Sequence, residues 1–186
     1  MNVQFDEATH TYTVDGKEYP SVTRILRPLS DFSNVPANVL QRAQEYGIAV
    51  HRMVELDIKG TLNADKLDPV LLPVLENWRQ AAKDWDILYS EVKLAHSSLK
   101  YAGRFDILAV MSRGLSLIDI KTGLFDPRVA GPQTAAYAEL LKNAGRGFPH
   151  RYVLTLRSDN HQLHPLEDKR DWPIFQSCLN LWRWVH

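Results

Sequence analysis

Two neighbouring apolar segments of the sequence carry charged side chains that could do chemistry. The stretch AGRFDILAVMSRGLSLIDIKTG, residues 102–123, reads as two strands joined by a Ser-Arg-Gly turn. Asp106 lies near the start of the first strand, Asp119 near the end of the second, and Lys121 two residues later. Isolated charges are rarely placed inside a protein unless they are paired or bind a metal. These three residues are therefore the first candidates for a functional site.

The spacing of the three residues favours a metal site. Side chains two apart in a strand project from the same face, so Asp119 and Lys121 share one. The hairpin ends that hold Asp106 and Asp119 adjoin, and two carboxylates there form a hard oxygen site suited to Mg²⁺ or Mn²⁺. The lysine can hold or deprotonate a water and stabilise charge on a phosphate. Taken alone, the Asp-Ile-Lys triplet is more often a surface ion pair.

Further residues with suitable chemistry occur on both sides of the hairpin. Gln133 and Tyr137 are four apart at the expected start of a helix, whose N-terminus favours phosphate; a solvent-facing Gln and a core-edge Tyr are the alternative. His51 shares a helix face with Glu55, although a lone histidine there is more often structural. Glu91 lies in the strand before the hairpin and could add a carboxylate.

The ordered set formed by these residues resembles the PD-(D/E)XK nuclease superfamily, and within it the RecB-type branch that includes lambda-type exonucleases. The matching features span roughly residues 47–138: His51, Glu91, GRFD with Asp106, DIKTG with Asp119 and Lys121, and Gln133-x-x-x-Tyr137. The opening HTYTVDGKEYPSVT is also similar to small phage-encoded members. The resemblance implies a restriction-endonuclease-like core and metal-dependent phosphodiester hydrolysis.

The resemblance also implies a role for each residue. Asp106 and Asp119 would be the metal carboxylates, the backbone carbonyl of Ile120 and the His51 imidazole would be further ligands, and Lys121 would position the water. Gln133 and Tyr137 would position DNA. Glu91 would bind a second metal or accept a hydrogen bond. Four arginines are candidate phosphate contacts: Arg24, Arg104, Arg128 and Arg146.

Composition limits the classes of function. The 186 residues contain 22 Lys+Arg and 22 Asp+Glu, so a large surface that coats nucleic acid is not expected, whereas a local basic groove remains open. The single cysteine, Cys178, excludes a disulfide framework and a four-cysteine zinc or iron–sulfur site within one chain; we expect it in the core of the last helix. No signal pattern or long apolar run is present, so we expect a cytoplasmic protein without a membrane segment, in the host cytoplasm if it is phage-encoded.

The expected elements give an α/β fold with a central mixed β-sheet flanked by helices and an N-terminal β-hairpin. The hairpin is signalled by Asp15-Gly16, and Ser21 is expected to cap a short helix. Gly47 could bend or divide a long helix that begins at Pro36 and stops at Gly60. The remaining elements are a helix from Asp68-Pro69, strands at about 87–95, 103–111 and 115–121, a helix at about 133–144 after a loop with Pro127 and Gly131-Pro132, two short strands, and a helix from about Asp171.

The whole chain is expected to be a single nuclease domain, residues 1–186. Its parts are the hairpin and short helix (1–30), a helical segment (36–86), the catalytic sheet with an inserted helix (87–166) and the C-terminal helix (170–186). The expected function is a Mg²⁺- or Mn²⁺-dependent DNA exonuclease that needs a free DNA end, acting in recombination, repair or phage DNA processing. A structure-specific endonuclease and a non-cleaving DNA-end-binding accessory protein are the alternatives. A helicase or recombination partner would be a separate protein, and a homo-oligomer remains open.

Overall fold

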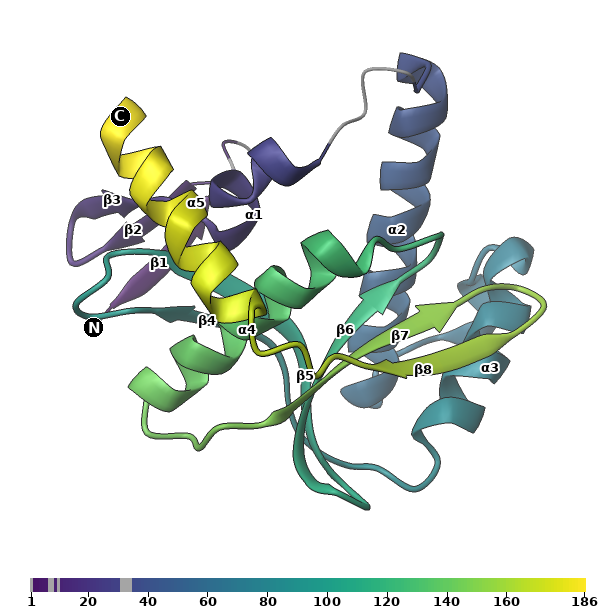
Figure 1. Cartoon of the computed structure of the whole chain (residues 1–186). Helices are drawn as coiled ribbons and strands as arrows, with labels where there is room; N and C mark the ends of the chain where they lie inside the picture. Colours follow the sequence, from purple (N-terminus) through teal and green to yellow (C-terminus); the bar gives the residue numbers. More distant parts are fainter. Residues whose placement is uncertain (1, 7–8, 10, 31–34) are drawn as a thin grey trace.

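Five strands form the sheet on which the rest of the chain packs (Figure 1). The computed structural model describes residues 2–6, 9, 11–30 and 35–186. The strands are β4 (Asp86–Ala95), β5 (Ala102–Met111), β6 (Gly114–Lys121), β7 (His150–Leu156) and β8 (His161–Pro165), in that spatial order. Strands β6 and β7 are parallel and the other neighbours are antiparallel. The predicted α/β fold with a mixed sheet is therefore confirmed.

The N-terminal residues form a small separate sheet of three strands, β1 (Val3–Asp6), β2 (Thr11–Val14) and β3 (Lys17–Tyr19). The predicted hairpin joins β2 to β3 through Asp15 and Gly16, which both have positive φ, as the tight turn requires. Strand β1 was not expected, and His10, at the start of the predicted hairpin, lies outside the described residues.

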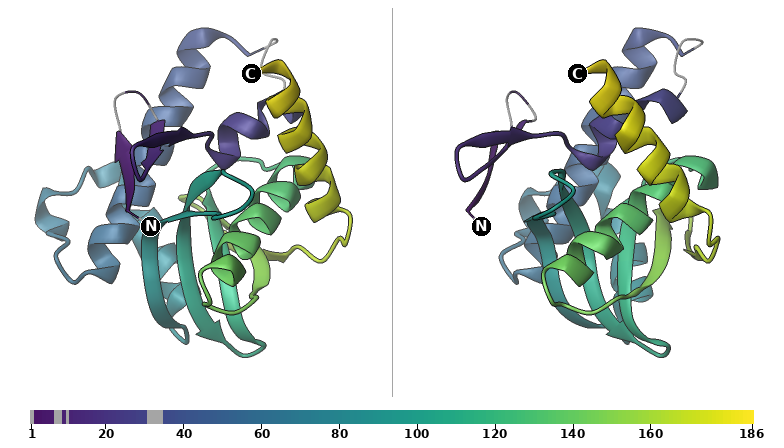
Figure 2. Two further views of the ribbon diagram at one scale, coloured as in Figure 1. Left: turned by 90° about the vertical axis from the view of Figure 1, so that its left-hand side faces the viewer. Right: turned by 60° about the vertical axis from the view of Figure 1, so that its left-hand side comes forward.

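Helices cover both faces of the central sheet (Figures 1 and 2). One apolar cluster joins α1 (Val22–Ile25), α4 (Pro127–Asn143) and α5 (Asp171–Val185) to the sheet, and another joins α2 (Ala37–Ile58) and α3 (Leu72–Ala82) to its other face. Short 3₁₀ turns are Arg27–Leu29, Ala64–Lys66 and Pro69–Leu71. Cys178 is buried in α5, as predicted. Of the described helices, none combines the length and the apolar character needed to cross a bilayer.

The first half of helix α2 is exposed to solvent. The helix runs without interruption through Gly47, so the glycine does not divide it. Its buried residues are Val50, Met53 and Val54, all in the second half. The described residues 37–49 contain no buried side chain, and Figure 1 shows this half extending beyond the sheet. The first half of α2 therefore leaves a free surface beside the sheet.

Helix α4 begins earlier than the sequence indicated. Pro127 occupies its first position, and the Asp126 carboxylate caps it by accepting from the Arg128 amide at 2.9 Å. Gly131 and Pro132 lie inside the helix rather than in a loop. Gln133 is therefore in the second turn, and the prediction that it lies at the helix N-terminus, beside free backbone amides, is wrong.

Gly131 is needed where α4 meets the start of α5. The Asp171 carboxylate lies against it and pairs with Arg151 at 2.9 Å, and both charged side chains are buried. A methyl group at Gly131 would overlap this carboxylate. The close approach explains why a residue that usually weakens helices is found inside α4.

We expect Gly131→Ala to destabilise the protein by about 1–3 kcal/mol, because overpacking against a buried ion pair outweighs the better helix propensity of alanine. Gly123→Ala is the matched control, since no described atom lies within 4 Å of its added methyl group. Urea denaturation measures both variants. An equal free energy of unfolding for the two variants would contradict the account of this contact.

Candidate metal centre

The centre forms where strands β5 and β6 part. Their regular pairing ends at Ile107 and Ile118. The amide of Ile120 then donates to Asp106 Oδ2 at 2.7 Å instead of to a backbone carbonyl of β5. A carboxylate that accepts a backbone N–H is held in one orientation. Asp106 is therefore fixed at the opening between the two strands.

Glu91 lies across from Asp106 on the neighbouring strand β4. The pairs Ser90–Ile107 and Val92–Phe105 bracket the two acidic residues in the sheet. Glu91 has a φ of 54°, a conformation that costs free energy in a residue other than glycine. Backbone strain of this kind clusters at functional sites. Here it occurs at the residue whose carboxylate reaches the candidate centre.

Helix α2 supplies the third member of the cluster, His51. Its Nδ1 atom lies 3.4 Å from Asp106 Oδ1 and 3.8 Å from Glu91 Oε1. The neighbouring Val50 and Val54 pack this turn of the helix into the core, which fixes the position of the imidazole. One ligand atom from each of His51, Glu91 and Asp106 lies within 4.8 Å of the others. The three side chains therefore converge on one point.

Charge holds this cluster together. The pKa of the His51 imidazole is raised to about 10, because the negative charge of Asp106 outweighs the effect of burial. Burial alone would raise the pKa of Asp106, but the charge and hydrogen bond of His51 bring this pKa below its ordinary value. A protonated histidine thus neutralises carboxylates that would otherwise repel each other. A divalent cation would do the same more strongly.

Asp119 and Lys121 form a second, adjoining group. The Asp119 side chain is only 4% exposed, and Lys121 Nζ lies 2.9 Å from its Oδ2 atom. Gln133 bridges the pair: its Nε2 donates to Asp119 Oδ1 at 3.1 Å and its Oε1 accepts from Lys121 Nζ at 3.3 Å. Burial and the nearby charge of Asp106 raise the pKa of Asp119. The two aspartates are thus close enough for one charge to affect the other.

The donor chemistry of the two groups fits a hard divalent cation. Asp119 Oδ2 is buried and accepts no well-aligned hydrogen bond, although the Lys121 ammonium is near it. A buried carboxylate oxygen in this state has a coordination position available. The donor atoms that converge, from His51, Glu91 and Asp106, give two carboxylates and one imidazole, a set suited to Mg²⁺ and better to Mn²⁺. Asp119 adjoins this group but is not among the residues whose donor atoms lie within 4.8 Å of one another, so its role as a metal ligand stays a prediction. The amide of Ile120 binds Asp106, and the role of the Ile120 carbonyl as a metal ligand stays a prediction.

Tyr137 is mainly a core residue. It is 4% exposed, belongs to the apolar cluster below α4 and lies against Gly103, where even one added methyl group would overlap its ring. Its hydroxyl accepts from Gln133 Nε2 at 3.3 Å. Gln133 is also buried, so both side chains reach the Asp119–Lys121 pair from the interior. Direct contact of either residue with DNA stays a prediction.

The four candidate phosphate-binding arginines lie in different places. Arg104 is next to the centre, with Nε 2.8 Å from Glu91 Oε2. Arg128 is exposed and pairs with Asp126, and Arg24 pairs with Glu18. Arg146 lies over the Tyr89 ring, between α4 and the start of β7, whereas Lys121 is at the other end of β6. Only Arg104 therefore contacts a residue of the metal centre.

His51 and Glu91 come together in the structure, and Glu91 is the candidate carboxylate whose role the sequence left open. Glu55 lies one turn after His51 in α2, as expected, and pairs with Arg52 and Lys59. Glu91 joins the histidine, because it lies opposite Asp106 in the sheet. The strand signal around Glu91 was visible in the sequence, whereas the register that brings it to Asp106 was not.

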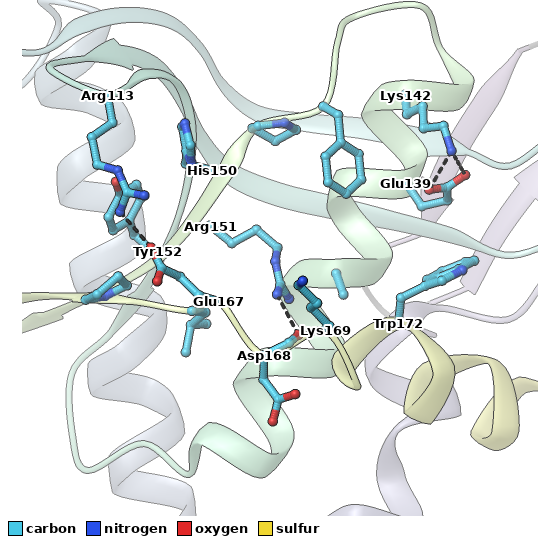
Figure 3. Close-up of a pocket in the computed structure, with 15 residues that line it drawn as sticks. Arg113, Glu139, Lys142, His150, Arg151, Tyr152, Glu167, Asp168, Lys169 and Trp172 are labelled. Atoms are coloured by element: carbon cyan, nitrogen blue, oxygen red, sulfur yellow. Dashed lines mark hydrogen bonds and ion pairs between the residues drawn. The ribbon is translucent and has the colours of Figure 1, made fainter.

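A pocket of about 490 Å³ lies apart from this centre, between α4, the start of α5 and strands β7 and β8 (Figure 3). None of its described lining residues belongs to the group formed by His51, Glu91 and Asp106. Its charged side chains pair mostly with one another, such as Arg113 with Glu167 and Lys142 with Glu139. Arg151, in the middle of Figure 3, forms an ion pair with Asp171, which lies outside the pocket lining. The candidate chemistry therefore does not lie in this pocket.

Comparison with known proteins gives no family for the chain. No family model and no curated protein matches it. Among solved structures, it is similar to one described as "Crystal structure of SSO0001", with 15% sequence identity and a TM-score of 0.42. The similarity covers 91% of this chain and 78% of that one. A TM-score this low supports no conclusion about what the chain does.

We expect metal binding to release about one proton and to tighten about tenfold per pH unit between pH 6.5 and 9. The reason is that His51, with a pKa of about 10, must lose its proton before it can coordinate a cation. Titration calorimetry with Mn²⁺, in buffers of different ionisation enthalpy, measures both quantities. His51→Gln should abolish the proton release, whereas His161→Gln, on the edge strand β8, should not. Affinity that does not change with pH would contradict His51 as a ligand.

Proposed function

We propose that the protein is a Mg²⁺- or Mn²⁺-dependent deoxyribonuclease, most specifically an exonuclease. The observation that carries this proposal is the convergence of His51, Glu91 and Asp106 beside the buried Asp119–Lys121 pair. A protein that only binds DNA has no need for clustered buried carboxylates, which cost stability unless they have a function. The ordered motif in the sequence supports the same conclusion.

The state of Lys121 favours one of its two possible roles. Burial lowers its pKa, but the Asp119 carboxylate outweighs this effect, and the pKa is raised overall. In the metal-free protein the Asp119 carboxylate therefore holds this side chain as an ammonium, and we propose that it acts as a hydrogen-bond donor. It can donate hydrogen bonds to the attacking water and stabilise the negative charge that develops on the phosphate.

The surrounding residues serve to hold this ammonium in place. Gln133 links it to Asp119, and Asp119 is in turn fixed by Gln133 Nε2. A bound cation would supply a Lewis acid for the phosphate and lower the pKa of an attacking water. His51, Glu91, Asp106 and Asp119 would hold that cation. Gln133 is then a positioning residue, because it acts through Asp119 and Lys121.

The preference for a free DNA end rests on the resemblance and on helix α2. The exposed first half of α2 adjoins the turn that carries His51, so a strand can lie along it toward the centre. We propose DNA with a free end as the substrate, in the cytoplasm, in recombination, repair or phage DNA processing. A structure-specific endonuclease and a non-cleaving end-binding accessory protein remain the competing proposals. Any helicase would be a separate partner, and a homo-oligomer is compatible with the same centre.

The protein is expected to degrade end-labelled linear DNA with Mg²⁺ or Mn²⁺ and to lose this activity in EDTA. Lys121→Met should lower the rate at least 100-fold while Mn²⁺ still binds, because the ammonium acts in the transition state. Lys142→Met is the matched control: it also removes an ion-paired lysine, but one that pairs with Glu139 on α4. Gel electrophoresis of the products measures the rates.

The same assay with covalently closed circles separates the competing proposals. Linear duplex and linear single strand should be cut, whereas closed circles of both should persist. Efficient cutting of closed circles would replace the exonuclease by an endonuclease with the same centre. Binding without any cutting, in every metal, would overturn the nuclease and favour the accessory protein.

A further inference from the structure

Two cations face each other in the sheet next to the metal centre. Lys93 of β4 and Arg104 of β5 are directly opposed in the strand register. Directly opposed side chains emerge on the same face, and like charges in such a pair destabilise a sheet. The pair lies two strand positions from the position where Glu91 and Asp106 meet, about 7 Å along the strands.

Both cations lie over the same aromatic ring. The Phe5 ring centre is 5.4 Å from Lys93 Nζ and 5.6 Å from the Arg104 guanidinium carbon. Strand β1, which carries Phe5, packs on β4. One ring thus draws two positive charges together, although their mutual repulsion would separate them.

Among the described residues, only one of the two cations has an ion pair. Arg104 is bound to Glu91 at 2.8 Å. For Lys93, no carboxylate oxygen of the described residues lies within ion-pair distance; the Phe5 ring is its partner. Lys93 is therefore a half-buried cation with no ion pair among the described residues, at the edge of the carboxylate cluster.

We infer that Lys93 and Arg104 form a binding site for a backbone phosphate of the nucleic-acid strand, next to the phosphate at the metal centre. A phosphate between the Lys93 ammonium and the Arg104 guanidinium would relieve their repulsion and accept hydrogen bonds from their N–H groups. This inference rests on the proposed function for its ligand. The N-terminal sheet then has a role in substrate binding, because Phe5 holds the two cations in place.

The test compares two lysines that both lie over an aromatic ring. Lys93→Met removes one charge of the opposed pair and keeps most of the side-chain volume. Lys100→Met is the control: Lys100 lies 5.8 Å from the Tyr19 ring centre, in the turn beyond the pair. The probe is a short single-stranded oligonucleotide, with Ca²⁺ in place of Mg²⁺ to prevent cutting. Fluorescence anisotropy at several salt concentrations gives the affinity and its salt dependence.

Lys93→Met should weaken binding about five- to tenfold and reduce the salt slope by about 0.7, the value for one phosphate contact on a single strand. Its Mn²⁺ affinity should be unchanged. Its Tm should stay the same or rise by about 1–3 °C, because the repulsion with Arg104 is removed. Lys100→Met should bind the oligonucleotide within about twofold of the unchanged protein.

Three results would overturn the inference: equal losses in the two variants, unchanged binding in Lys93→Met, or a lower Tm that accompanies its loss of binding. The outcomes also separate this inference from the proposed function. If the protein binds the oligonucleotide through Lys93 but cuts no DNA, the proposed phosphate site stands and the proposed nuclease function is wrong. If the Lys93→Met variant cuts DNA normally and binds the oligonucleotide with unchanged affinity, the proposed nuclease function stands and the proposed phosphate site is wrong.

Discussion

The hydrogen bond from the Ile120 amide to Asp106 is the interaction on which the rest of the centre depends. It holds a carboxylate at the point where β5 and β6 stop pairing, so the end of β6 can turn Asp119 and Lys121 toward α4. Without this acceptor, a buried backbone N–H would be unpaired, at a cost of about 1–3 kcal/mol. The Asp106 carboxylate thus satisfies the last backbone N–H of the sheet at this point and also faces His51.

The charges of the centre alternate, and this arrangement makes so many buried ionic groups tolerable. Asp106 is paired with His51, Asp119 with Lys121, and Glu91 with Arg104. Each carboxylate therefore has a cation at or near hydrogen-bond distance, and the penalty of desolvation is met by direct contacts. The ion pairs compensate the buried charges without a metal. Loss of the proton from His51 would remove one of these positive charges, and a metal cation could then take its place.

Local patterns in the sequence were sufficient for most elements and for the identity of the reactive residues. Asp15-Gly16 marked a hairpin, and two apolar runs joined by a Ser-Arg-Gly turn marked β5 and β6, because these signals act over a few positions. The start of α4 was missed for a tertiary reason: Gly131 serves the contact with Asp171, and Pro132 does not end the helix. Glu91 was among the candidate carboxylates, but its place opposite Asp106 and its positive φ depend on the assembled sheet, which local patterns do not reveal.

Anomalous scattering from a crystal soaked in Mn²⁺ tests the central claim most directly, because it locates the ion without reference to activity. We expect a manganese peak about 2.0–2.3 Å from donor atoms of His51, Asp106 and at least one further carboxylate of the centre, Glu91 or Asp119. Full occupancy of a site elsewhere on the chain, with His51 still bound to Asp106 as it is without metal, would contradict it.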